Sequence, residues 1–192
     1  LAPFSYFDFL ANELVQGNPD LKRSLINNFD LRFEYFPQGG ELIAVSLFYK
    51  KFNDPIEEIL TASSSNEPIR SYANAISADN YGLELELRKS LGFISESINN
   101  FSFVGNVTLI KSTIQLNSDN SGFQESERPL QGQADYIFNL GLYFDDLASG
   151  INSSIVYNKV GWRIAKVGTS DLGNTLEKPV DVIDFSVSKR FY

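Results

Sequence analysis

The feature that most constrains this sequence is a strict alternation of apolar and polar side chains, which begins after Asn27. The apolar positions are Phe29, Leu31, Phe33 and Tyr35, and the polar positions between them are Asp30, Arg32 and Glu34. Because successive side chains of a β-strand point to opposite faces, the alternation predicts a strand with one face in an apolar phase and the other in water. Either a protein core or a lipid bilayer can be that apolar phase.

The same alternation recurs along the chain and predicts about seven strands in all. The later runs cover residues 41–52, 81–91, 101–116, 133–144, 151–164 and 180–192. The connections are alternately short (37–40, 92–99 and 145–150) and long (53–77, 117–130 and 165–177). Short turns at one rim and long loops at the other are typical of membrane β-barrels, whereas soluble sandwiches have shorter strands. We therefore predict an all-β, antiparallel up-and-down barrel wall, with a soluble β-sandwich module for binding or adhesion as the alternative.

Aromatic residues support the barrel. They make up 14% of the chain, with 16 Phe and 9 Tyr against a single Trp, so their placement needs an explanation. Many lie near the ends of the alternating runs, where outer-membrane barrels carry aromatic girdles. These are Phe29, Tyr35, Tyr49, Tyr81, Phe101, Tyr136, Phe144, Tyr157, Phe191 and Tyr192. In the sandwich alternative the same side chains fill a protein core.

The composition argues against several functions. The chain has no Cys and no His, which removes disulfides, thiolate chemistry and the commonest general base and metal ligand. A net charge of −8 without clustered Lys and Arg argues against a nucleic-acid partner. No run approaches the roughly 18 apolar residues that a membrane-spanning helix needs. The missing Cys and His thus argue against two large classes of enzyme.

Three motifs carry a resemblance to a known family. The turn "NPDLK", which begins at Asn18, leads into a strand of the form N-x-D-L-x-x-E-Y; the strand "YGLELE" covers residues 81–86, and "RPLQGQ", residues 128–133, precedes another strand. In order and spacing these segments resemble the C-terminal half of the β-barrel of TonB-dependent outer-membrane receptors, most closely those of the Bacteroidetes type.

The resemblance implies a barrel of about 22 strands with an N-terminal plug domain in its lumen. Residues 1–192 would be the partial barrel domain, without the plug and the last strands, and we read Leu1 as a cut point in a longer chain. The protein would lie in the outer membrane of a Gram-negative bacterium and take up a scarce nutrient. Its implied partners are outer-membrane lipid, the TonB–ExbB–ExbD machinery through the missing plug, a small-molecule, glycan or peptide ligand and, in glycan importers, a surface lipoprotein. The resemblance implies no enzymatic activity and no cofactor. A passive porin is a further alternative.

Two groups of residues are candidates for contact with a solute. Arg32, Glu34, Glu84, Glu86 and Arg88 fall on the polar faces of two predicted strands, where they can line the lumen, contact the plug or simply pair within the wall. Trp162, Arg163 and Lys166 precede a long loop that is extracellular in the barrel, so they can touch a ligand. For Trp162, a place in the aromatic girdle is the alternative.

Three other patterns carry no chemistry in our interpretation. Residues 117–128 begin like a calcium loop, but Arg128 stands at the twelfth position, where a bidentate Glu is needed. The adjacent pairs Glu57 and Glu58, and Asp145 and Asp146, cannot work together as acid and base because neighbours on a strand point to opposite faces.

Overall fold

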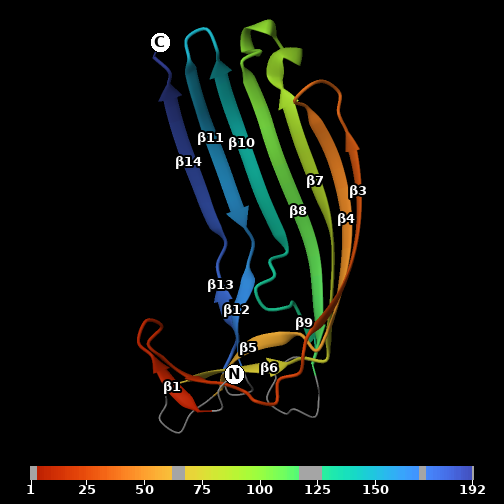
Figure 1. Ribbon diagram of the computed structural model, residues 1–192, viewed down its shortest axis with the longest axis vertical. Coiled ribbons are helices and arrows are strands. Elements are labelled where there is room, and N and C mark those ends of the chain that lie inside the picture. Colours follow the sequence, from red (N-terminus) through yellow and green to blue (C-terminus); the bar gives the residue numbers. More distant parts are fainter. Residues whose placement is uncertain (1–3, 62–67, 117–126, 169–171, 192) are drawn as a thin grey trace.

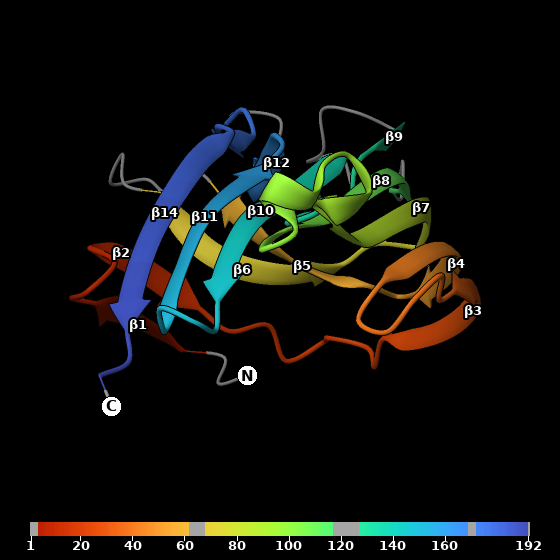
Figure 2. The same ribbon diagram turned by 90° about the horizontal axis from the view of Figure 1, so that it is seen from above.

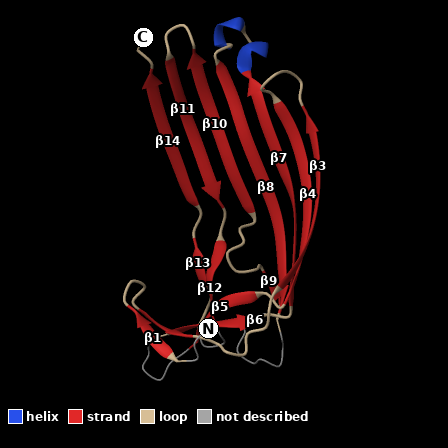
Figure 3. Ribbon diagram, viewed as in Figure 1, coloured by secondary structure: helices blue, strands red, loops and turns tan. Residues whose placement is uncertain are grey.

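The computed structural model describes residues 4–61, 68–116, 127–168 and 172–191. It contains two β-sheets, a tall curved one and a smaller one that lies across one end of it (Figure 1). The tall sheet is called the wall and the smaller sheet the outer sheet. Among the described residues the helical elements are two single 3-10 turns, η1 (Leu91–Phe93) and η2 (Glu96–Ile98), which stand out in Figure 3.

The wall consists of long antiparallel strands that follow the predicted alternating runs. In spatial order they are β14 (Val180–Lys189), β11 (Ile151–Val160), β10 (Tyr136–Asp146), β8 (Phe101–Gln115), β7 (Ser77–Ser90), β4 (Leu42–Asn53) and β3 (Leu25–Tyr35). The two-residue strand β9 (Glu127–Arg128) adds to the end of β8. Consecutive long strands are neighbours, so the wall has the predicted up-and-down order.

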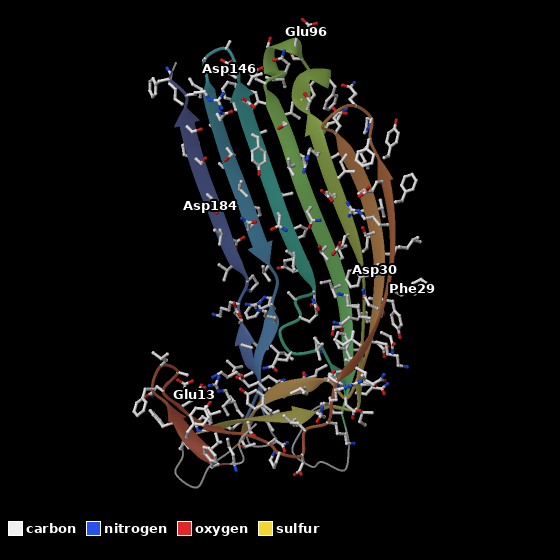
Figure 4. The ribbon with its side chains drawn as sticks, viewed as in Figure 1. Glu13, Phe29, Asp30, Glu96, Asp146 and Asp184 are labelled. Carbon is white, nitrogen blue, oxygen red and sulfur yellow. The ribbon has the colours of Figure 1, made fainter. Side chains whose placement is uncertain are left out.

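The register keeps the apolar side chains on one face across the whole wall. Phe33, Val45, Leu85, Val107 and Phe138 are successive cross-strand partners. Figure 2 shows the wall bent into an arc, and Figure 4 shows Phe29 on its outer side and Asp30 on its inner side. Because a slip of one residue would send every apolar side chain to the wrong face, this register is strongly specified by the alternation.

Aromatic rings lie toward both ends of the apolar face. Phe29, Tyr49 and Tyr81 are cross-strand partners toward the end where the outer sheet lies. Phe101 and Phe144 meet near the opposite rim with ring centroids 4.9 Å apart. This arrangement matches the positions predicted for a girdle at these five residues.

The apolar face has no second sheet packed on it within the described parts of the chain. Phe29 is 75% exposed, Leu31 65%, and Phe185 on β14 73%, so these side chains do not form a protein core. The described buried cluster is small and lies where the wall meets the outer sheet, around Ala75, Ala78 and Ile114. The sandwich alternative, which needs a shared core between two facing sheets, is therefore not the observed architecture.

The outer sheet was not predicted. Its strands, in spatial order, are β1 (Ser5–Asp8), β2 (Glu13–Gln16), β6 (Ile69–Asn74), β5 (Ile56–Thr61), β12 (Arg163–Gly168) and β13 (Thr175–Glu177). Three of them, β5, β6 and β13, come from the long connections, and β12 begins in the predicted strand over residues 151–164 and ends in the connection 165–177. Two pairings, β2 with β6 and β5 with β12, are parallel, so the chain as a whole is not purely antiparallel.

The predicted strand over residues 151–164 is wrong at its end. The wall strand β11 stops at Val160, and the Gly161 amide donates to the Tyr136 carbonyl at 2.9 Å. The chain then enters β12, whose Val167 and Gly168 pair with Ile59 and Leu60 of β5. A single alternating run is thus divided between two sheets. The sequence does not show the division, because both segments are strands with the same period of two.

None of the described helices is long and apolar enough to cross a membrane.

Candidate functional site: the inner wall and the outer sheet

The inner face of the wall carries an ion-pair network centred on Arg32. Its guanidinium donates to Glu34 Oε1 at 2.6 Å, to Glu86 Oε2 at 2.8 Å and to Ser46 Oγ at 3.1 Å. These residues come from β3, β7 and β4, which the register places side by side. The Arg32 and Glu34 side chains are 39% and 40% exposed, so the network stands open on the inner side of the arc.

Glu84 and Arg88 also lie on this inner face, two residues before and after Glu86 on β7. Glu84 is the cross-strand partner of Ser46 on β4 and of Thr108 on β8. Arg88 lines an open groove with residues of β8, β10, β11 and β14, most of which are Ser, Asn or Asp. The predicted sharing of one face by all five charged candidates is confirmed by the register, while their contact with a solute stays a prediction.

A row of neutral amides continues the polar face across the arc. Glu86 pairs with Asn106 on β8, which pairs with Asn139 on β10, which pairs with Asn158 on β11. Carboxamides donate and accept hydrogen bonds at once, so such a row can carry water or hydroxyl-rich solutes without holding a charge. The inner face is therefore charged along β3 and β7 and largely neutral from β8 to β11.

The structure separates the three outer candidates. Arg163 on β12 forms a bidentate pair with Glu177 on β13, with Nε to Oε2 at 2.8 Å and Nη2 to Oε1 at 2.9 Å. The hydrogen bonds from Arg163 lower the pKa of Glu177. Lys166 donates to Glu13 on β2. Trp162, between the two sheets, is 49% exposed and is the candidate with the most free surface.

A cluster around Arg70 on β6 was missed by the sequence analysis. Its guanidinium lies 3.0 Å from Asp8, 3.6 Å from Glu13 and 3.7 Å from Glu58. Backbone amides of Ala11 and Leu10 donate to Asp8 and, with Arg70, lower the pKa of its carboxyl. The partners lie 12 to 62 residues away from Arg70 in sequence, and no short motif marks them.

The adjacent acids Glu57 and Glu58 do point to opposite faces, as predicted. Glu58 faces Arg70, whereas Glu57 is buried against Arg128 of the "RPLQGQ" motif, with both side chains only 3% exposed. Glu57 and Arg128 each stand in a noted pattern of the sequence, but no sequence signal pairs them, and a buried charged pair is unusual. Glu57 and Glu58 therefore do not face each other across a cleft.

The calcium-loop pattern lies almost entirely outside the described residues, since it covers 117–128. Within the described parts of the chain no group of three or more carboxylates is placed to hold a metal ion.

The geometry defines a class of protein: a barrel wall with an apolar outer face, a polar inner face and its long connections gathered at one rim. A sequence model of the family described as TonB dependent receptor-like, beta-barrel matches residues 2–192. The chain belongs to this family, whose members act as receptors and transporters. No curated protein sequence matches it.

Solved structures show the same fold at low sequence identity. The siderophore receptor PirA from Acinetobacter baumannii matches 94% of this chain with a TM-score of 0.60 and 17% identity, over 27% of its own length. PirA from Pseudomonas aeruginosa matches 97% with a TM-score of 0.59 and 15% identity, over 28% of its length. The FrpB iron transporter from Neisseria meningitidis matches 93% with a TM-score of 0.57 and 15% identity, over 25% of its length. The chain thus spans about a quarter of the structures that it matches, and the predicted fold class is confirmed.

Proposed function

We propose that residues 1–192 form part of the wall and outer mouth of an outer-membrane receptor of a Gram-negative bacterium. This receptor takes up a scarce nutrient with energy from TonB–ExbB–ExbD. The observation that carries the proposal is the two-faced wall, because a continuous exposed apolar face opposite a polar one fits a strand layer between lipid and a wet lumen. In this proposal the chain is the C-terminal part of a Bacteroidetes-type barrel, and the plug and the closing strands belong to the rest of the polypeptide.

The edges of the wall support a larger barrel. Every residue of β3 and of β14 is exposed, and within the described chain each of these strands pairs with another strand along one side only. Unpaired strand edges are not stable in a bilayer, where no water can satisfy them. We infer that β3 and β14 pair with further strands of the same barrel rather than with a second copy of this fragment.

A ferric siderophore is the ligand class we propose to test first. The similar structures include siderophore receptors, an iron transporter and the ferric enterobactin receptor of Pseudomonas aeruginosa. Trp162, Arg163 and Lys166 would then lie where a ligand enters, and Arg32, Glu34, Glu84, Glu86 and Arg88 would line its path or contact the plug. A glycan ligand, with a surface lipoprotein over the mouth, is the alternative within the same family.

The placement of the wall can be tested with single cysteines, since residues 1–192 contain none and any cysteine elsewhere in the receptor can be replaced by Ser. In the full-length receptor, Phe185→Cys and Ser186→Cys are adjacent on β14 and lie on opposite faces. An environment-sensitive fluorophore should report lipid at position 185 and water at position 186. Equal, water-like signals at both positions would exclude a lipid-facing wall.

Transport is tested separately in cells that express the full-length receptor with and without TonB. Uptake of radioactive iron from ferric enterobactin should require both the receptor and TonB. Uptake that needs the receptor but continues without TonB would instead identify a passive porin.

A further inference from the structure

Glu57 and Arg128 form a buried ion pair that joins two distant parts of the chain. Arg128 Nη1 donates to Glu57 Oε1 at 2.9 Å, and Nη2 donates to Oε2 at 2.6 Å. Both side chains are 3% exposed, and 71 residues separate them. Removing charges from water is costly unless the geometry is good and the remaining polar atoms are bonded. The pair therefore needs further partners.

Gln131, three residues after Arg128, supplies those partners and extends the connection to β12. Its backbone amide donates to Glu57 Oε1 at 3.0 Å, and its side-chain oxygen accepts from the Glu58 amide at 2.7 Å. Its side-chain nitrogen donates to the Ala165 carbonyl at 2.8 Å. One residue of the connection between β8 and β10 thus bonds to β5 and to β12, which come from the other two long connections.

The next residue, Gly132, completes the junction. Its amide donates to the Ile164 carbonyl of β12 at 2.9 Å, and its φ of +77° is a conformation that only Gly adopts at little cost. The chain can turn here and still keep its bonds to β12.

The same segment is fixed to the rim of the wall. Arg128 pairs with Ile114 at the end of β8, and the Leu130 amide donates to Ser112 Oγ at 2.9 Å. Ser112 in turn donates to Asn80 Oδ1 on β7 at 2.6 Å, and Asn80 donates to Gln133 Oε1 at 3.2 Å. Residues 128–133 therefore contact the wall on one side and the outer sheet on the other.

We propose that Glu57, Arg128 and Gln131 are positioning residues that hold β5, β12 and the wall rim together as one unit. This set is called the mouth latch. The mouth latch makes the outer sheet a preformed surface. A ligand that had to order three separate loops would bind more weakly, because the ordering costs free energy. The statement about ligand binding rests on the proposed function, whereas the coupling of the strands does not.

Hydrogen exchange in the full-length receptor, in lipid and without ligand, tests the coupling. Glu57→Gln keeps the shape and an acceptor for the Gln131 amide but removes the charge, and Arg128→Met removes the cation. Because each variant leaves one buried charge unpaired, amide exchange in the outer sheet should become at least about tenfold faster. The increase should be equal in β5 and in β12, although neither variant lies on β12, and exchange in the middle of β8 should not change.

Arg163→Gln is the matched control. Arg163 forms an equally well aligned bidentate pair in the same sheet, but its pair with Glu177 is about 40% exposed and joins only β12 and β13. This variant should leave exchange in β5 unchanged. Faster exchange in β5 alone after Glu57→Gln, with β12 unaffected, would overturn the latch, because the contacts would then be merely local.

A second measurement separates the latch from the proposed function. If ferric enterobactin is the ligand, Glu57→Gln should raise the concentration that gives half-maximal uptake and leave the maximal rate unchanged. If the wild-type receptor does not take up ferric enterobactin, that ligand is excluded. The hydrogen-exchange experiment would still test the mouth latch, because it is made without ligand.

Discussion

The inner face of the wall and the junction between the wall rim and the outer sheet are built from the same kind of strand, yet their charged groups differ in exposure. On the wall, Arg32 and its carboxylate partners stand half open on the inner face, and the apolar side chains are exposed on the outer face. At the junction, Glu57 of β5 and Arg128 of β9 are almost fully buried within the described chain. The wall is therefore a surface between two environments that lie outside it, whereas the junction supplies the hydrogen-bond partners of its buried charged pair from the chain itself.

The largest effect should come from a charge placed on the outer face of the wall. Val107→Arg puts a guanidinium in the middle of the apolar row, which in a bilayer costs about 2–4 kcal/mol of the free energy of unfolding. Asn106→Arg, one residue earlier on β8, places the same group on the polar row and should cost far less. Unfolding by denaturant of the full receptor in lipid vesicles measures both. Equal losses would mean that the two faces do not see different environments.

The next effect concerns the close packing on the inner face. A Cβ on Gly82 would lie 2.4 Å from the Leu109 carbonyl oxygen and 2.5 Å from Cζ of Phe48, its cross-strand partner. Gly82→Val should therefore destabilise the wall by about 1–3 kcal/mol, because backbone and ring cannot both move aside. A Cβ on Gly39, in the short turn after β3, would meet no atom within 4 Å apart from its chain neighbours, so Gly39→Ala should be tolerated. Thermal unfolding measures both variants. Equal melting temperatures for Gly82→Val and Gly39→Ala would show that the wall around Gly82 can move to accept a side chain.

Arg32→Gln should have a small effect and so sharpens the contrast with Arg128. It removes the hydrogen bonds to Glu34 and Glu86, but these groups are open enough for water to replace them. The melting temperature should match that of the wild type, whereas Arg128→Met should loosen the outer sheet. If Arg32→Gln lowered the melting temperature as much as Arg128→Met, water would not replace the hydrogen bonds of Arg32, and the inner face would be as inaccessible to water as the mouth latch.

The smallest effect is a pH dependence at the edge of the outer sheet. Hydrogen bonds from Arg163 lower the pKa of Glu177 in the folded state. The pair therefore stabilises the β12–β13 hairpin above the pKa of Glu177 in the unfolded chain, and this stabilisation is lost as the pH falls through the lower folded pKa. Hydrogen exchange in β13, corrected for its intrinsic pH dependence, should show the loss in the wild type and not in Arg163→Gln. A loss of the same size in that variant would assign the effect to another carboxyl group.

Much of the wall could be predicted from the sequence because its signal is local. Runs such as "YGLELELRKSL" predict which side chains lie on the apolar face and which on the polar face, and the lengths of the connections predict the order of the strands. The shared face of Arg32, Glu34, Glu84, Glu86 and Arg88 followed from the same period of two, and the register confirmed it.

The outer sheet could not be predicted in this way. Strands such as β13, with three residues, are too short to show a period, and the parallel pairs β2–β6 and β5–β12 join segments far apart in sequence. The residues of the mouth latch were visible, since "RPLQGQ" was singled out and Glu57 was noted, but nothing in the sequence pairs one with the other.

The sequence by itself determined the two faces of the wall, because the alternation of side chains on a strand is a property of each strand alone. Only the tertiary structure decided which charges are buried and paired. Burial depends on which segments meet, and Glu57 meets Arg128 only after three long connections have folded together at one rim of the wall.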